Sequence, residues 1–244
     1  DDPRVAIIDE HDTVHMAHMD IHFGFSINGV AALHTKILED TELHPFYEIY
    51  PEKFSNKTNG ITFRRWLMAC NPELSALITS LIGNGWKKDA TELEKLGQFV
   101  SDPSVLTELL DVKAEKKAQL VSYLKNTQGL ELNPDSIFDI QVKRLHEYKR
   151  QLMNILHIMY LYNELKDHPD MDFYPRTFIF GAKAAAGYRN AKLTIKLINS
   201  VADVINNDPV VDGRIKVVFI ENYRVSNACL LYTSPSPRDR TRSR

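Results

Sequence analysis

The second half of the chain alternates short apolar runs with longer amphipathic segments, and this alternation restricts the fold more than any other feature. Three runs have the length and composition of buried strands, at residues 136–141, 177–181 and 214–221. Amphipathic stretches at 143–166 and 187–207 lie between them and predict helices. Strand–helix–strand units of this length pair in parallel, so the expected fold class is α/β, with a Rossmann-like doubly wound parallel sheet.

The first half of the chain predicts mostly helices. Helical spacing of apolar residues extends over residues 14–40 and returns at 64–81, and two further helices are expected at 91–100 and 105–126. Residues 40–62 contain two prolines and an Asn-Gly turn signal, so a linker or a long functional loop is expected there.

The charge balance and the cysteine count exclude several classes of protein. Lys and Arg number 30 against 32 Asp and Glu, so no bulk charge indicates a nucleic-acid or membrane partner. No apolar run approaches the roughly 20 residues of a membrane span. Cys70 and Cys229 cannot support a disulfide framework, which fits a reducing compartment. We therefore expect a cytoplasmic globular protein that contacts neither nucleic acid nor membrane.

The strongest chemical signal is the sequence KRLHEYKR, directly after the first expected strand. It contributes the cations Lys143, Arg144, Lys149 and Arg150. Ligands of parallel sheets bind beyond the carboxyl ends of the strands, and a following helix N-terminus favours anions, so a phosphate site is predicted. The alternative is a solvated charged face in which Glu147 pairs with Lys143 and Arg150.

Three weaker signals remain open. Residues 181–188 (GAKAAAGY) fit either a phosphate-cradling turn or glycines that allow close strand–helix packing. Residues 56–66 (NKTNGITFRRW) combine amides with an aromatic ring, which suits a carbohydrate or cofactor site, or they form a turn that begins a helix. Four histidines share helical spacing with interleaved apolar residues, so a packed helix is favoured and no metal site is expected; they are His11, His15, His18 and His22.

Several of these motifs together resemble the α-glucan phosphorylases, the family that acts on glycogen, starch or maltodextrin. The resemblance runs colinearly from about Arg4 to Ala228 and is carried by residues 26–34 (SINGVAALH), 56–66, 140–151 (IQVKRLHEYKRQ), 181–188 and 221–226 (ENYRVS). It implies an incomplete two-lobe GT-B-type glycosyltransferase fold. The implied reaction is phosphorolysis of α-1,4-glucans by inorganic phosphate to glucose 1-phosphate, in a homodimeric parent enzyme.

The resemblance also implies a pyridoxal 5′-phosphate cofactor whose phosphate group serves as the proton donor. By the same resemblance, Arg144 and Lys149 bind the substrate phosphate, and Lys149 also lies near the cofactor phosphate. The remaining cofactor-binding residues that it implies are Lys143, Trp66, Tyr223 and Arg224.

The implied sugar contacts come from both halves of the chain. Asn59 and Tyr148 are expected to bond to glucosyl hydroxyl groups, and Val30 is expected near the sugar pocket. His146 and Asn28 are expected to contact these residues without contacting the sugar themselves.

The resemblance divides the chain into three parts. Residues 1–57 are expected to end an N-terminal lobe and residues 58–228 to begin the cofactor-binding lobe, whereas residues 229–244 are expected to be a disordered, non-native tail. Phe63 and Ala186 stand where the family usually has proline. The Gly-rich segment and the Schiff-base lysine of the family are absent from this sequence, so the chain by itself is expected to be inactive.

Two alternatives to the phosphorylase assignment remain open. A nucleotide-sugar glycosyltransferase of the same architecture would hold a diphosphate at the cation cluster. A nucleic-acid-binding module would use the basic segment and the Arg-rich tail, but the tail's positive charge leaves residues 1–228 net negative, which argues against it.

Overall fold

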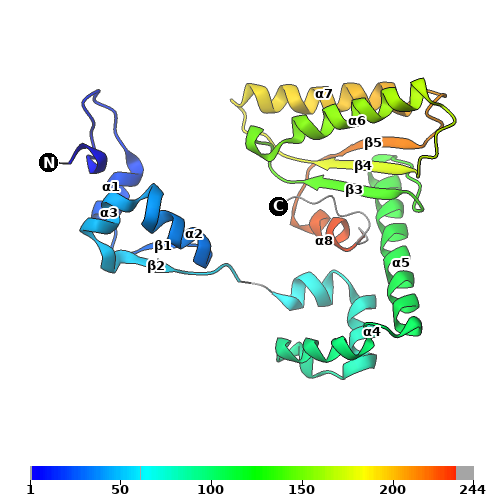
Figure 1. The fold of residues 1–244 in the computed structure, drawn as a ribbon, viewed down its shortest axis with the longest axis horizontal. Coiled ribbons are helices and arrows are strands. Elements are labelled where there is room, and N and C mark those ends of the chain that lie inside the picture. Colours follow the sequence, from blue (N-terminus) through cyan, green and yellow to red (C-terminus); the bar gives the residue numbers. More distant parts are fainter. Residues whose placement is uncertain (1, 61, 235–244) are drawn as a thin grey trace. The chain divides into compact units, whose positions relative to one another are not determined.

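The computed structural model describes residues 2–60 and 62–234, and the chain divides into two compact units, residues 1–62 and 63–244 (Figure 1). Each unit has an apolar cluster of its own. The division falls shortly after the boundary expected at residue 57. Among the described residues, no helix combines the length and apolar character that crossing a membrane requires.

The second unit is built on a three-stranded parallel sheet in the order β3-β4-β5. These strands are β3 (Ile137–Val142), β4 (Arg176–Gly181) and β5 (Ile215–Ile220). Helices α6 (Gln151–Asp167) and α7 (Arg189–Asn206) make the connections between them. The three strands lie within about two residues of their expected positions, and the predicted parallel α/β fold is confirmed.

Helices cover both faces of this sheet (Figure 1). On one face, α6 and α7 pack against Phe178 and Phe180. On the other, α5 (Pro103–Gln128) and α8 (Val225–Thr233) pack against Phe138 and Ile179. Because β4 is buried on both faces, its sequence is a continuous apolar run and not an alternating one.

An exposed ionic contact ties α6 to the turn after α7 and makes stability depend on pH. The Tyr162 hydroxyl and the Lys166 ammonium donate to Asp208 Oδ2 over 2.6 and 2.9 Å. The hydrogen bonds from Tyr162, Lys166 and the Val210 N–H lower the pKa of Asp208 from 3.8 to about 2. The carboxylate therefore contributes stability above pH 3.8, and this contribution is lost as the pH falls toward 2.

Asp208→Asn is expected to remove that pH-dependent contribution. Between pH 4 and pH 2 the urea midpoint of the wild type should fall more steeply than that of the variant, since only the wild type protonates a bonded carboxylate. Parallel midpoint curves for the two proteins over this interval would contradict the assignment.

The helix expected from residue 143 begins only at Gln151, so this prediction is wrong for residues 143–150. Arg150 has a φ of 62°, a left-handed conformation that interrupts the helix, and Glu147–Lys149 forms a single 3₁₀ turn. The N–H groups of Lys143 and Leu145 bond instead to the carbonyls of Gly181, the last residue of β4, and of Lys183. Lys143, Arg144 and Lys149 therefore precede α6 and do not lie in its first turns as expected, whereas Arg150 is the N-cap of that helix.

Two shorter segments of this unit also differ from the expectations. The region expected to form one helix at 64–81 consists of a π-helical turn, Arg64–Ala69, and α4 (Pro72–Ile82), whose first turn Asn71 caps. The helix expected at 91–100 is a 3₁₀ segment, Ala90–Phe99.

The first unit contains two short parallel strands and several short helices. The helical pattern expected over residues 14–40 is confirmed at α1 and α2 but is wrong for the residues between them, because a strand that ends at Gly29 interrupts it. A Cβ on Gly29 would lie 2.6 Å from the Thr35 N and Cα, so only glycine fits there. The elements are α1 (Met16–Phe23), β1 (Ile27–Gly29), α2 (Ala32–Ile37), a π-helical turn (Leu38–Glu42), α3 (His44–Ile49) and β2 (Phe54–Asn56). Helix α3 and strand β2 lie within residues 40–62, which were expected to form a linker or a long loop.

The start of the expected disordered tail is ordered. Helix α8 continues to Thr233, and Leu231 packs into the cluster beneath β3 and β5. Cys229 on this helix is disulfide-bonded to Cys70, with 4.9 Å between their Cα atoms. One such bond is no disulfide framework, but it differs from the expectation that the two cysteines fit a reducing compartment. The structure thus differs from the expectation at residues 229–234, and residues 235–244 lie outside the described part of the chain.

Candidate functional site

The predicted cation cluster lies in the loop that leaves the carboxyl end of β3. The N–H of Lys143 donates to the Gly181 carbonyl over 3.0 Å, and the N–H of Leu145 donates to the Lys183 carbonyl over 3.2 Å. A Cβ on Gly181 would lie 2.9 Å from Val142 Cγ1, so glycine permits this approach. The two motifs that follow β3 and β4 are therefore held side by side, at the edge of the sheet where ligands of parallel sheets bind.

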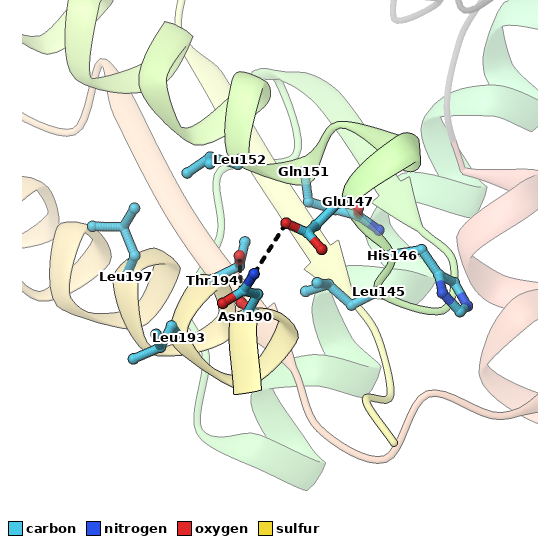
Figure 2. A pocket seen from close by; sticks show the side chains of 9 residues that line it. All are labelled: Leu145, His146, Glu147, Gln151, Leu152, Asn190, Leu193, Thr194 and Leu197. Atoms are coloured by element: carbon cyan, nitrogen blue, oxygen red, sulfur yellow. Dashed lines mark hydrogen bonds between the residues drawn. The ribbon is translucent and has the colours of Figure 1, made fainter. Parts of the chain in front are cut away.

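Glu147, the carboxylate within the cluster, bonds to the loop and helix that follow β4 (Figure 2). Its Oε1 accepts from Asn190 Nδ2 over 3.1 Å, and its Oε2 accepts from the Tyr188 hydroxyl over 2.7 Å. The bond to Glu147 raises the pKa of Tyr188 above its usual value. The solvated-face alternative required Glu147 to neutralise Lys143 or Arg150, and the observed contacts do not support it.

Four cations of the loop consequently keep their charge uncompensated. Among the residues that the structure describes, Lys143, Arg144, Lys149 and Arg150 form no ion pair, although such pairs are present elsewhere in the chain. Lys149 Nζ lies 5.5 Å from the centre of the Tyr148 ring, whose other neighbour is the stacked ring of His146 at 5.4 Å. A concentration of unpaired cations at a strand end can hold an anion with charge-assisted hydrogen bonds.

Hydrogen bonds from side-chain amides hold the backbone of this loop in place. Gln141 Nε2 donates to the Lys149 carbonyl over 3.2 Å, and Asn154 Nδ2 donates to Gln141 Oε1 over 2.9 Å. Gln151, which is 2% exposed, donates from Nε2 to the Arg144 carbonyl over 3.4 Å. The sequence gives no signal for these roles, because isolated amides in strands and helices have no distinctive pattern.

A cavity of about 330 Å³ lies between this loop and α7 (Figure 2). Its lining is largely apolar, with a few polar groups that include Glu147 and Thr194. None of the four cations lines it, so the cavity is separate from the predicted phosphate site. The lining residues are Leu145, His146, Glu147, Gln151, Leu152, Asn190, Leu193, Thr194 and Leu197.

Trp66 and Tyr223, two residues expected to line a cofactor, both contact Tyr232 of α8. The rings of Trp66 and Tyr232 meet edge to face, with their centres 6.4 Å apart. Burial and a hydrogen bond with Tyr232 raise the pKa of Tyr223 to about 12. Arg224 is exposed at the N-cap of α8. The structure therefore brings Trp66 and Tyr223 to the same neighbour, Tyr232.

The expected sugar ligands are divided between the two units. In the first unit the N–H of Asn59 donates to the Val30 carbonyl over 3.0 Å, which places both residues beyond the ends of β1 and β2. Asn28 precedes them and bonds to the Gly29 carbonyl over 3.2 Å. Tyr148 belongs to the second unit and is 75% exposed.

The spaced histidines of the first unit make local contacts. His18 Nδ1 lies 2.7 Å from the Ala6 carbonyl, and His22 Nε2 lies 2.8 Å from the Val5 carbonyl. His15 Nε2 lies 3.0 Å from Asp9 Oδ2. Within residues 2–60 and 62–234, no group of three or more His, Cys, Asp or Glu side chains is arranged to hold a metal ion.

The parallel sheet and the unpaired cations at its edge define a Rossmann-like domain suited to binding phosphate. Comparison with known families makes this specific: the carbohydrate phosphorylase model matches residues 2–236, and the chain belongs to that family.

Curated relatives agree with the family match. The chain is 53% identical to a maltodextrin phosphorylase of Streptococcus pneumoniae over 94% of its length, 52% identical to a glycogen phosphorylase of Bacillus subtilis over 91%, and 49% identical to the liver form of human glycogen phosphorylase over 92%. It spans only 30%, 28% and 27% of the lengths of these relatives.

Proposed function

We propose that this chain is part of an α-1,4-glucan phosphorylase, which uses inorganic phosphate to release terminal glucose as glucose 1-phosphate. The names of the relatives support this reaction. The observation that carries the proposal is the set of unpaired cations beyond β3, held in place while Glu147 is bonded elsewhere. The parent enzyme is proposed to be a cytoplasmic homodimer.

In this proposal each side chain of the cluster has a separate task. The Arg144 guanidinium binds two oxygens of the substrate phosphate, and the Lys149 ammonium offsets the remaining charge. The Tyr148 hydroxyl of the second unit and the Asn59 amide of the first unit are each proposed to bond to glucosyl hydroxyl groups. Such positioning lowers the barrier because phosphate and sugar carbon are already aligned when the glycosidic bond breaks.

The proposed cofactor, pyridoxal 5′-phosphate, is only partly matched by the residues present. Unpaired Lys143 and Lys149 suit its phosphate group, and the exposed Arg224 adds a third cation. Trp66 and Tyr223, however, both contact Tyr232 where the resemblance implied a cofactor ring. When bound, the cofactor supplies a phosphate group that exchanges protons with the substrate phosphate. The mechanism proposed for this chain's residues is limited to binding and orientation.

The alternatives receive no support from the comparisons. The relatives are named as phosphorylases, which disfavours a nucleotide-sugar glycosyltransferase. The segment expected to form a basic helix is a loop with one 3₁₀ turn, which removes the helix on which the nucleic-acid alternative depended.

A chimeric enzyme tests the proposal. Residues 4–228 would replace the matching segment of the Streptococcus pneumoniae maltodextrin phosphorylase, and glucose 1-phosphate release from maltodextrin would be measured with and without phosphate. The chimera is expected to be active only with phosphate, and the isolated 244-residue chain is expected to show no turnover. A folded chimera without activity would contradict the proposal, and turnover by the isolated chain would contradict the expectation that this chain is inactive by itself.

A further inference from the structure

Arg150, at the end of the cation-bearing loop, has a backbone conformation that arginine does not favour. Its φ of 62° and ψ of 30° lie in the left-handed region, which is unfavourable for side chains of this size. Such a conformation persists only where surrounding contacts hold it, and residues of this kind are concentrated at functional sites. The contacts around Arg150 therefore determine how the loop presents its cations.

Both polar groups of the peptide that joins Lys149 to Arg150 are hydrogen-bonded. The Lys149 carbonyl accepts from Gln141 Nε2 over 3.2 Å, and the N–H of Arg150 donates to the Glu147 carbonyl over 3.0 Å. Because a peptide group is planar, bonds on its two sides fix its orientation. That orientation sets ψ of Lys149 and φ of Arg150, and with them the directions in which both cationic side chains leave the backbone.

Gln141 is in turn held by Asn154 of α6. Asn154 Nδ2 donates to Gln141 Oε1 over 2.9 Å, so the carboxamide of Gln141 has one partner at its oxygen and another at its nitrogen. The amide cannot rotate without breaking one of these bonds. The pair thus joins three segments, which are the carboxyl end of β3, the end of the loop and the beginning of α6.

The place of Gln141 in the sheet would suit an apolar residue. Its register partner on β4 is Phe180, which is 1% exposed and belongs to the apolar cluster beneath α6 and α7. An apolar side chain at residue 141 would pack against this cluster and leave no polar group to satisfy. Packing therefore does not account for the amide, whereas its bond to the loop does.

We propose that Gln141 and Asn154 are positioning residues of the phosphate site, which hold the peptide between Lys149 and Arg150 in the orientation that lets the Lys149 ammonium bind phosphate. Neither amide contacts the ligand itself. This inference rests on the proposed phosphate site, and it predicts that phosphate affinity falls when the amide pair is removed although all four cations remain.

Titration of the full chain with inorganic phosphate, followed through the backbone amide resonances of the loop, tests the pair. Gln141→Met removes both bonds and keeps the length of the side chain. It is expected to weaken phosphate binding about ten-fold, the lower end of the loss that follows removal of outer partners at metal sites. The three-bond coupling between the amide and Cα protons of Arg150, which depends on φ, should change in the same variant, while its circular dichroism spectrum remains that of the folded chain.

Asn154→Ala distinguishes a positioning role from separate structural roles. It removes only the bond that orients Gln141, so a smaller loss of phosphate affinity is expected. The double variant should bind phosphate no more weakly than Gln141→Met alone, because Asn154 acts through Gln141. Asn163→Ala is the matched control, since Asn163 is an exposed residue of the same helix, and its phosphate affinity should equal that of the wild type.

The outcomes separate this inference from the phosphate site on which it rests. If the wild type binds phosphate and Gln141→Met binds it equally well, the positioning role is wrong and the site stands. Losses that add in the double variant, or a Gln141→Met chain that does not fold, would show structural contributions only and also overturn the positioning role. A wild type that binds no phosphate would overturn the site and this inference together.

Discussion

Replacing Arg144 and Lys149 together by alanine is expected to weaken phosphate binding to this chain by about 100-fold or more. Each hydrogen bond between a cationic side chain and an anion is worth about 1.5–3 kcal/mol, or roughly a factor of ten to a hundred. Isothermal titration of inorganic phosphate into wild type and variant at low ionic strength measures the difference, because added salt screens exposed charges.

The control is Lys196→Ala, which removes an exposed cation from α7 without touching the cluster. Its phosphate affinity should equal that of the wild type. If Lys196→Ala weakened binding as much as the double variant, phosphate would be responding to overall charge, and the site assignment would be wrong.

The largest expected loss of stability follows from Lys116→Ala. Lys116 lies on α5, is 3% exposed and forms an ion pair with Glu73 of α4. Gln119 Nε2 also donates to Glu73 Oε1 over 2.7 Å. Removing one partner of a buried ion pair leaves the other charge without compensation, at a cost of about 3–5 kcal/mol. Because Glu73 retains some exposure, we expect the lower end of this range, about 3 kcal/mol, in urea unfolding at pH 7.

The pH dependence of this loss gives a second readout. Burial raises the pKa of Glu73, but the hydrogen bonds from Lys116 and Gln119 outweigh it, and the pKa lies below 4.5. The ion pair therefore contributes above pH 4.5 and is lost as the pH falls through the lowered pKa. The difference between wild type and Lys116→Ala should shrink below pH 4.

Lys125→Ala is the matched control on the same helix. Lys125 pairs with Glu131 at the surface over 3.0 Å, and surface pairs contribute little. A loss from Lys125→Ala as large as that from Lys116→Ala would show that helix propensity or net charge, and not the buried pair, accounts for the result.

The strands of the second unit could be predicted closely because their signal is local. A strand buried on both faces needs an apolar residue at nearly every position, as in the run Thr177–Gly181, and such a run is visible without knowledge of its neighbours. The start of α6 could not be predicted in this way. The left-handed Arg150 ends a loop that bonds to Gly181 and Lys183, and these contacts join segments more than thirty residues apart.

The candidate site was predictable in composition but not in geometry. The cations and their place at a strand end follow from the sequence of β3 and the KRLHEYKR motif. Whether Glu147 neutralises them depends on the direction of one side chain, and Tyr188 and Asn190 determine that direction. Likewise, the approach of Asn59 to Val30 follows from the pairing of β1 with β2, which helical spacing over residues 14–40 concealed.

The most direct test of the phosphate site is a titration of the isotope-labelled chain with inorganic phosphate, followed through its backbone amide resonances. We expect saturable shifts confined to the amides of residues 143–150 and 181–183, and no shifts there in the double variant Arg144→Ala, Lys149→Ala. Shifts centred on other parts of the chain, or no saturable response at these amides in the wild type, would contradict the assignment of this loop as a phosphate site.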